Sequence, residues 1–459
     1  MRNYRSVVGI DYFCSIMSSA LFSDYNISRQ LHRSLDDMGF SLPTPIQEKC
    51  FSPIMAGRSM VGIAQTGTGK TLAYLLPLFN LWKFTKEPHP TMVVLVPTRE
   101  LVIQVEEQAR KLAAHNAIRI VGIYGGASIN TQKEMLAVGV DLLVATPGRL
   151  IDLVTTGNLK LKNVKHLVID EMDEMFGQGF RPQLLRIFDS LPKRRQNLLF
   201  SATITDDISE FLDEHYFGLD RVEAGPASAP AGTVEAIAFK VPNFTTKIDL
   251  LEHLLRTDGS MRKVLVFVST IRMAEYLHER LSARIEEMIG MLHSNRAQNT
   301  RFRLLEEFAD GKFKVLIATD LAGRGVDIED VTHVVNFDLS EQAEDYVHRI
   351  GRTGRAGKSG VAISLISQHD RMQDIEDFTG ISFQFVPLPD EIEFSPVVTE
   401  FDKPVIRMKN PLVEDTVSGA AFHEKKAKNM KVNMHMTREQ KHKLKYGKPK
   451  SKGGNFKKK

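Results

Sequence analysis

The chain consists of short, continuous apolar runs separated by longer stretches of mixed polarity. In its first half the runs are rich in Val, Ile and Leu and lie at 59–64, 91–98, 119–126, 141–147, 166–170 and 197–203. Continuous rather than alternating apolar runs are typical of strands buried on both faces of a parallel sheet. The segments between them, such as 99–115, are long enough for crossover helices. The pattern therefore predicts an α/β fold.

A change of composition divides the chain. Residues 224–233 (AGPASAPAGT) contain Pro, Gly, Ala and Ser without a periodic apolar pattern, which is typical of a linker. A second series of apolar runs follows, at 263–270, 289–294, 313–320, 332–339 and 360–367. We therefore predict two α/β lobes, preceded by a tail and followed by an extension and a second tail. The expected boundaries are 1–19 tail, 20–223 lobe one, 224–233 linker, 234–386 lobe two, 387–423 extension and 424–459 basic tail.

Composition is that of an ordinary soluble protein. Of 459 residues, 42% are hydrophobic and 25% are charged, and no apolar run reaches 18 residues, so no transmembrane helix is expected. Asp11 interrupts the apolar letters near the N-terminus, which disfavours a signal peptide, and Met17 is an alternative start. Cys14 and Cys50 match no metal spacing and are expected to be reduced thiols in the cytoplasm.

Charge is unevenly distributed along the chain. Residues 424–459 contain 14 Lys or Arg against Glu424 and Glu439, a net charge of +12, whereas the whole chain carries +4. The remaining residues therefore carry −8. The basic segment is poor in large apolar residues, so we expect it to be disordered and to bind a polyanion. A tail that only keeps the chain in solution is the alternative.

A phosphate-binding loop is predicted at 64–71 (AQTGTGKT), after one expected strand and before an apolar, helix-like stretch. In the turn Gly67–Thr68–Gly69, the glycines let backbone N–H groups face phosphate oxygens, and the following helix adds its positive N-terminal end. Lys70 is expected to reach the outer phosphates and Thr71 to hold Mg²⁺ through its hydroxyl. A chance glycine-rich turn is the alternative.

The second part of such a site is predicted in VIDEMDEMF (168–176). Asp170 ends an expected strand and is placed to hold the metal, and Glu171 is placed to deprotonate the attacking water. An acidic pair after a strand is by itself more often a solvated turn. The phosphate loop upstream in the same lobe favours the catalytic interpretation.

Cations for the transition state are predicted in lobe two. HRIGRTGR (348–355) places three arginines and a histidine within eight residues, separated by glycines. Arg352 and Arg355 are candidate arginine fingers, a class of group associated with about 10³–10⁵ in rate. A basic loop that contacts solvent or nucleic acid is the alternative. If the loop and the arginines belong to different lobes, hydrolysis requires the lobes to close.

These motifs together resemble the DEAD-box RNA helicases of helicase superfamily two. The resemblance extends over roughly 20–385, with the motifs in order. They are Phe22 with GFSLPTPIQ (39–47), AQTGTGKT (64–71), PTREL (97–101), the glycine pair 125–126, TPGR (146–149), VIDEMD (168–173), SAT (201–203), VFVST (266–270), Gln298 with Arg301, ATDLAGRGVD (318–327) and HRIGRTGR (348–355).

The resemblance implies two RecA-like lobes, with ATP and one RNA strand bound on opposite edges of the cleft between them. In such a protein Gln47 reads the adenine edge, Phe22 stacks on the ring and Asp327 contacts the ribose. His348 links the arginine motif to the metal motif and to a coupling group, which comprises Asp173, Ser201 and Thr203. RNA contacts are implied at Arg99, Gly126, Thr146, Arg149, Gln298, Arg301, Thr319 and Arg324. Most should reach phosphates and 2′-hydroxyls, with little sequence preference.

Met172 departs from the family's Asp-Glu-Ala-Asp. That position is neither ligand nor base, and Asp170, Glu171 and Asp173 remain, so we predict an active ATPase. The leading prediction is a monomeric ATP-dependent RNA helicase that needs Mg²⁺ and separates strands locally, without processive travel. An ATP-gated RNA clamp with little strand separation is the alternative. A translocating DNA helicase is a weaker one.

Overall fold

The computed structural model describes residues 21–402 apart from 66, 217, 225–233, 286–287, 294, 297, 321–327, 329, 341, 355–358, 369 and 398, and it leaves out the side chain of Gln298. The roles predicted for Arg324, Asp327 and Arg355, and those of the N-terminal tail and the basic tail, lie outside the described residues. Within them, no helix is long and apolar enough to cross a membrane.

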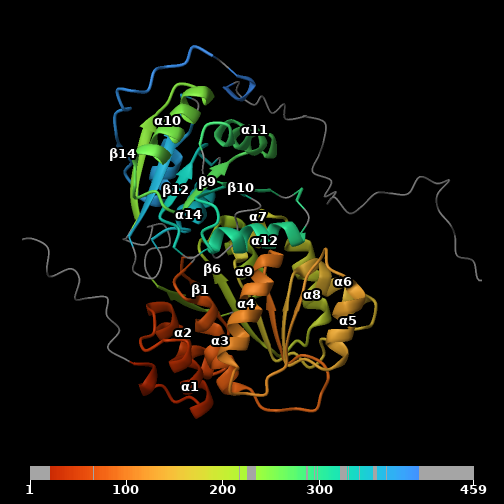
Figure 1. The fold of residues 1–459 in the computed structure, drawn as a ribbon. Coiled ribbons are helices and arrows are strands. Elements are labelled where there is room, and N and C mark those ends of the chain that lie inside the picture. The colour runs from red at the N-terminus through yellow and green to blue at the C-terminus, as the bar shows by residue number, and fades with distance from the viewer. Residues whose placement is uncertain are drawn as a thin grey trace, which may run out of the picture. The chain divides into compact units, whose positions relative to one another are not determined.

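Lobe one contains a seven-stranded parallel sheet of order β3-β4-β2-β5-β6-β1-β7 (Figure 1). Its strands are β1 Met60–Ile63, β2 Met92–Leu95, β3 Ile120–Ile123, β4 Leu142–Ala145, β5 His166–Ile169, β6 Gln196–Ser201 and β7 Asp220–Glu223. Its helices are α1 Arg29–Asp37, α2 Pro45–Met55, α3 Lys70–Leu81, α4 Arg99–Leu112, α5 Ile129–Ala137, α6 Pro147–Thr155, α7 Met172–Gly177, α8 Arg181–Ser190 and α9 Asp206–His215, after a 3₁₀ turn at Phe22–Asp24.

Each face of this sheet is buried under its own helices, which explains the continuous apolar runs. Alternate strand residues such as Val94 and Val168 join α1–α4 in one core cluster. Their neighbours, such as Val93 and Ile169, join α5–α9 in a second cluster. Helix α3 ends beside Trp82, the only tryptophan of the chain.

Lobe two contains a second seven-stranded parallel sheet, of order β10-β11-β9-β12-β13-β8-β14. Its strands are β8 Val234–Lys240, β9 Val264–Val268, β10 Ile289–Leu292, β11 Val315–Thr319, β12 His333–Asn336, β13 Gly360–Ile366 and β14 Gln384–Phe385. Its helices are α10 Phe244–Thr257, α11 Ile271–Ser282, α12 Gln298–Ala309, α14 Ala343–Ile350 and α15 Met372–Thr379, with a 3₁₀ turn at Glu400–Asp402.

The two sheets have the same topology. Counted from the first strand of each lobe, both orders read 3-4-2-5-6-1-7. The predicted α/β fold with two sheet-and-helix lobes is therefore confirmed, and every predicted apolar run contains a strand. Three strands were not predicted. β7 is half exposed, β8 has only Ala238 and Phe239 buried, and β14 has only two residues, both exposed.

Candidate active site and nucleic-acid interface

The phosphate loop leaves the carboxyl end of β1 and leads into α3. Gly69 has a φ of +88°, a left-handed conformation that a side chain would strain, and a Cβ there would lie 2.3 Å from the Gln47 side chain. Lys70 follows as the first residue of α3. Its side chain is buried, and its Nζ has no hydrogen-bond partner among the described residues. A buried ammonium without a partner fits an anionic ligand, because burial without one is unfavourable.

Gln47 ties α2 to this loop. Its Oε1 accepts the N–H of Thr44 at 2.9 Å, and its Nε2 donates to the carbonyl of Gly69 at 3.1 Å. The first contact is part of a capping box that begins α2. The side chain predicted to read adenine therefore also holds the backbone of the phosphate loop.

The acidic pair lies at the carboxyl end of β5, and β6 separates that strand from β1. Asp170 accepts hydrogen bonds from the Tyr74 hydroxyl at 3.0 Å and from the Glu171 N–H at 2.9 Å. Glu171 has a φ of +51°, a left-handed conformation that costs a non-glycine residue about 1–2 kcal/mol. The strain therefore lies at the N-cap of α7, and Glu171 lines the same cleft as the phosphate loop.

Burial raises the pKa of both carboxyls. For Asp170 the Lys70 ammonium opposes the effect. For Glu171, Arg352 and Lys70 both oppose it, so the charge of a lobe-two arginine acts on a lobe-one carboxylate. A raised pKa brings a carboxylate closer to the basicity that proton abstraction at neutral pH requires.

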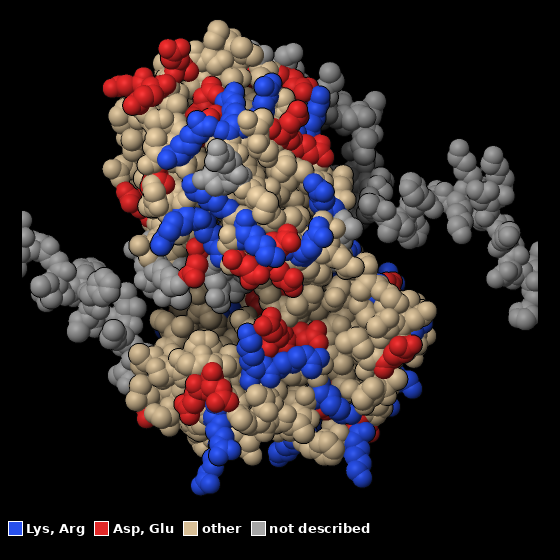
Figure 2. Space-filling model, viewed as in Figure 1, with Lys and Arg blue, Asp and Glu red and all other residues tan. Residues whose placement is uncertain are grey.

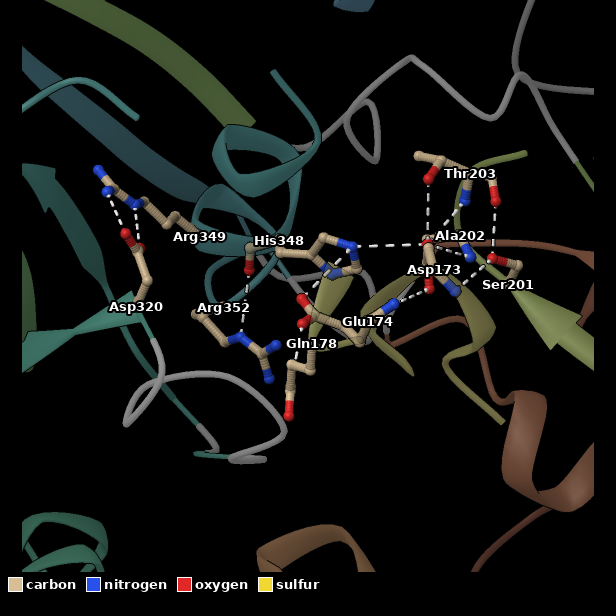
Figure 3. Close-up of polar contacts among 10 residues, drawn as sticks. All are labelled: Asp173, Glu174, Gln178, Ser201, Ala202, Thr203, Asp320, His348, Arg349 and Arg352. Atoms are coloured by element: carbon tan, nitrogen blue, oxygen red, sulfur yellow. Dashed lines mark hydrogen bonds and ion pairs between the residues drawn. The ribbon is translucent and has the colours of Figure 1, made fainter. Parts of the chain in front are cut away.

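Asp173 is the centre of the coupling group (Figure 3). Its Oδ2 accepts the N–H groups of Ala202 and Thr203, each at 2.9 Å, and the Thr203 hydroxyl at 3.2 Å. Its own N–H donates to Ser201 Oγ at 3.2 Å, and that hydroxyl donates to the Thr203 carbonyl at 2.6 Å. The three predicted coupling residues therefore lie in direct contact, between the start of α7 and the end of β6.

His348 brings lobe two into this group. Its Nε2 lies 3.5 Å from Asp173 Oδ2 and 3.8 Å from Glu174 Oε1. Burial alone would lower the pKa of His348, but the hydrogen bond and the charge of Asp173 outweigh burial and raise it. Burial alone would raise the pKa of Asp173, but the hydrogen bond and the charge of His348 lower it below its usual value. The geometry therefore favours a charged pair between the lobes.

The arginines of 348–355 have different surroundings. Arg349 forms a bidentate ion pair with Asp320 at 2.6 and 2.8 Å and donates to the Asp338 carbonyl, all within lobe two. Arg352 is buried, donates to the His348 carbonyl at 3.2 Å and lines the same cleft as the phosphate loop. Arg352 is therefore the described arginine that the fold presents to the lobe-one site.

The cleft has a volume of about 200 Å³. Its lining includes Phe40, Gln47, Gly67, Gly69, Lys70, Thr71, Asp170, Glu171 and Arg352. Phe22, predicted to stack on adenine, is instead 3% exposed and packs edge-to-face on Tyr25 in the core. Phe40 is 43% exposed and lines the cleft. Phe40 follows Gly39 in the segment GFSLPTPIQ, and that position was the available sequence signal. Within that segment we assigned a role only to Gln47.

Met172 points away from this cleft. Its side chain is fully buried in the core cluster on the α5–α9 face, with Met175 and Phe211. Met172, the residue of VIDEMDEMF that departs from the family's motif, is therefore part of the hydrophobic core between the sheet and its helices. Asp170, Glu171 and Asp173 keep the hydrogen bonds and charge interactions described above.

The predicted RNA contacts of lobe one lie at the carboxyl edge of its sheet. A Cβ on Gly126 would lie 2.2 Å from Arg99 Nη1, so the Arg99 guanidinium packs directly on the glycine loop. Arg149 is buried and donates to Gln132 Oε1 at 2.7 Å and to the Ala127 carbonyl at 3.0 Å. The Arg149 side chain therefore also contacts the loop that contains Gly126. Thr146 begins α6 and is 9% exposed.

In lobe two, Thr319 ends β11 and Arg301 belongs to α12. Arg301 Nη2 forms an ion pair with Glu100 Oε1 of lobe one at 2.8 Å, and both side chains are largely buried. Sequence reasoning missed Glu100 because its role appears only when the lobes meet. The pair is a second charged contact between the lobes, distinct from His348 with Asp173.

These features together describe a two-lobed protein in which Arg352 of the second lobe lines the same cleft as the phosphate loop of the first. Two family models match the chain, DEAD/DEAH box helicase over residues 44–211 and helicase conserved C-terminal domain over residues 246–357. The ATP-dependent RNA helicase RhlB of Shewanella frigidimarina is 36% identical over 356 residues, which cover 76% of this chain and 81% of the relative. RhlB of Idiomarina loihiensis is 39% identical over 373 residues, covering 79% and 87%.

Solved structures agree with this assignment. Dbp5 of S. cerevisiae bound to RNA and ADP BeF3 has a TM-score of 0.73 and 29% identity, covering 80% of this chain and 95% of that one. Mss116p bound to single-stranded RNA and AMP-PNP has a TM-score of 0.72 and 26% identity, covering 79% and 78%. The chain belongs to the DEAD/DEAH box helicase family, and the resemblance read from its motifs is confirmed. The predicted class of enzyme, an RNA-stimulated ATPase and ATP-dependent RNA helicase, is confirmed with it.

Proposed function

We propose that the chain hydrolyses ATP with Mg²⁺ between its lobes and uses lobe closure on RNA to separate short duplexes locally. The observation that carries this proposal is the meeting of lobe-two groups with the lobe-one site, because Arg352 lines the cleft and His348 contacts Asp173. Relatives named as ATP-dependent RNA helicases and neighbours solved with RNA support the same function.

For nucleotide binding, Lys70 and the turn 67–69 would hold the phosphates, and Thr71 with Asp170 would hold Mg²⁺. Mg²⁺ commonly takes only one or two protein oxygens and completes its shell with water and phosphate. Bound there, it neutralises charge that develops on the phosphates. Gln47 would read the adenine edge, and Phe40 rather than the buried Phe22 would stack on the ring.

For hydrolysis, Glu171 would orient the attacking water and accept its proton. The water oxygen bonds to the γ-phosphorus as the bond from that phosphorus to the bridging oxygen breaks, so that ADP leaves and inorganic phosphate is formed. Arg352 would neutralise charge on the transferred group, and we assign Arg355 the same role. Asp173, Ser201, Thr203 and His348 would report the state of the cleft to the RNA side. We assign Asp327 to the ribose.

For RNA, we propose contacts from Arg99, Gly126, Thr146, Gln298, Thr319 and Arg324. Arg149 and Arg301 would act mainly by positioning, since both are already engaged with protein groups. Contacts of this kind reach the backbone and give little sequence preference. We place the enzyme in the cytoplasm as a monomer.

The deciding experiment is steady-state ATP hydrolysis with single-stranded RNA, with DNA of equal length as the control. We expect strong stimulation by RNA alone, and loss of turnover in Glu171→Gln with ATP-dependent RNA binding retained. A rate unchanged by RNA would reject the coupled ATPase. Stimulated hydrolysis without separation of a short duplex, but with a long-lived ATP-bound RNA complex, would favour the clamp.

A further inference from the structure

Tyr74 lies one turn into α3, next to the residues that begin that helix. It follows Thr71 by three residues and Lys70 by four, and side chains at these spacings share one face of a helix. Lys70 and Thr71 line the cleft, whereas the Tyr74 side chain is fully buried in the lobe-one core. Tyr74 therefore neighbours two cleft residues while it is itself part of the core.

The Tyr74 hydroxyl joins α3 to the carboxyl end of β5. It donates to Asp170 Oδ2 at 3.0 Å, while Asp170 Oδ1 accepts the N–H of Glu171 at 2.9 Å. The two oxygens of this carboxylate therefore accept from two different elements, which together fix the plane of the carboxyl group. An ionised carboxylate has about four lone-pair sites, so both oxygens can still face a metal ion or the water around it.

Packing holds the Tyr74 ring in place. Its centroid lies 5.3 Å from that of Phe200, a residue of β6, and β6 is the strand between β5 and β1. Phe200 is paired in register with Gly62 of β1, where a Cβ would lie only 2.7 Å from the phenylalanine ring. Gly62 thus leaves the space that Phe200 fills, and Phe200 in turn packs on Tyr74. The position of the hydroxyl is therefore set by the core as well as by its hydrogen bond.

The Tyr74 hydroxyl is a permanent donor to Asp170. Burial and the charge of Asp170 raise the pKa of Tyr74 well above its ordinary value, and the Thr71 hydroxyl partly opposes this effect. The phenol therefore keeps its proton, and its hydrogen bond to the carboxylate persists. Because Thr71 also acts on this hydroxyl, Tyr74 interacts with both of the residues that we propose as protein ligands of Mg²⁺.

Few protein groups are available to hold a metal ion. Within the part of the chain that the structure describes, no group of three or more His, Cys, Asp or Glu could do so. On the face drawn in Figure 2, Asp and Glu are interspersed with Lys and Arg over both lobes rather than gathered in one acidic patch. Mg²⁺ demands nearly ideal octahedral geometry. A site with one carboxylate and one hydroxyl therefore depends on how accurately those two groups are held.

We propose that Tyr74 is a positioning residue for Mg²⁺, because its hydroxyl holds the Asp170 carboxylate in the orientation that binds the metal of the metal–nucleotide complex. The inference rests on the proposed function, in which Thr71 and Asp170 hold that metal. A group that orients a metal ligand in this way typically accounts for about 10- to 100-fold in metal affinity. A hydroxyl that only satisfied its own hydrogen bond in the core would affect folding stability and leave metal affinity unchanged.

The test is Tyr74→Phe, which removes the hydroxyl and keeps the ring that packs on Phe200. Calorimetry on the full chain measures the affinity for AMP-PNP, a non-hydrolysable ATP analogue, once with Mg²⁺ and once with EDTA. We expect the factor by which Mg²⁺ tightens binding to fall about tenfold in the variant, or to vanish where the parent gains less than that. The affinity in EDTA should match that of the parent, because Lys70 and the phosphate loop are unchanged.

Tyr216→Phe is the matched control. The Tyr216 hydroxyl is also buried in lobe one, but its side chain packs against the core on the α5–α9 face of the sheet. This variant should keep the parent affinities for AMP-PNP with Mg²⁺ and with EDTA. Asp170→Asn tests the route of the effect. If the hydroxyl acts through that carboxylate, adding Tyr74→Phe to Asp170→Asn should cause no further loss of the Mg²⁺ effect.

The outcomes separate the role of Tyr74 from the proposed function. If Mg²⁺ does not tighten AMP-PNP binding to the parent chain, the metal site of the proposed function fails, and the role of Tyr74 fails with it. If Mg²⁺ tightens binding equally in the parent and in Tyr74→Phe, only the role of Tyr74 is overturned. A loss of affinity in EDTA as large as the loss in Mg²⁺, or a further loss in the Asp170→Asn background, would overturn it too, because Tyr74 would then support the phosphate loop.

Discussion

Replacing His348 with Ala should uncouple the lobes without unfolding either of them. The imidazole is 4% exposed and lies 3.5 Å from Asp173 Oδ2 across the cleft. In its absence Asp173 keeps its contacts to Ala202 and Thr203, so the loss is one charged hydrogen bond rather than a stranded carboxylate. Such a bond contributes about 1.5–3 kcal/mol. If that energy is realised in the closed state, RNA-stimulated turnover falls about 10- to 150-fold.

The assay is steady-state hydrolysis over a matrix of ATP and RNA concentrations. We expect kcat to fall and more RNA to be needed for half-maximal stimulation, with little change in ATP binding to lobe one. His333→Ala is the matched control, because His333 is also a buried lobe-two histidine, and its carboxylate neighbour Asp258 lies 4.0 Å away in the same lobe. Turnover within about twofold of the parent in His348→Ala, or equal losses in both variants, would refute the reasoning.

The same contact predicts a pH dependence. The pKa of His348 is raised, so the contribution of its charge is fully present below its ordinary pKa and is lost as pH rises through the raised value. The pKa of Asp173 is lowered, so its contribution is lost only in strong acid. We therefore expect an alkaline decline in RNA-stimulated turnover that is absent from His348→Ala.

Four further substitutions separate packing from chemistry. Met172→Ala should lower the free energy of unfolding, measured by denaturant melts, by about 2–5 kcal/mol because the side chain is buried in the core. RNA-stimulated turnover per folded molecule should change little. A large rise in turnover would show that Met172 impairs coupling. Phe40→Ala should raise the KM for ATP several-fold, whereas Phe22→Ala should lower the free energy of unfolding. If instead Phe22→Ala raised the KM and Phe40→Ala lowered the free energy of unfolding, adenine stacking would be assigned to Phe22. Glu100→Gln should weaken RNA stimulation of hydrolysis about tenfold with basal hydrolysis unchanged, because it removes the charged partner of Arg301 in the other lobe. If RNA titrations of hydrolysis matched those of the parent chain, the ion pair would have no part in RNA stimulation.

The sequence predicted what depends on local pattern. Strands buried on both faces leave a continuous apolar run, and the phosphate loop and acidic pair each lie within a few residues after such a strand. Edge strands leave weaker traces, so β7 and β14 were missed, and β8 was missed because only Ala238 and Phe239 of its seven residues are buried. The positions of Asp173, Ser201 and Thr203 were predicted from motifs alone, and they do meet.

What failed to emerge from the sequence depends on contacts between distant segments. A motif does not show that Phe22 turns into the core while Phe40 remains at the cleft, since that choice depends on how α1 and α2 pack. It does not show that Arg149 is used to brace a loop, or that Arg301 finds Glu100 in the other lobe.

Trp82, next to the last residue of α3, gives the protein a built-in spectroscopic probe. It is the only tryptophan, its Nε1 is buried without a hydrogen-bond partner among the described residues, and its partly buried side chain packs against the lobe-one core. Its fluorescence therefore reports the melting of lobe one, whereas circular dichroism reports the melting of both lobes. A gap between the two transitions would measure how independently the lobes fold, and coincident curves would mean that they fold as one cooperative unit.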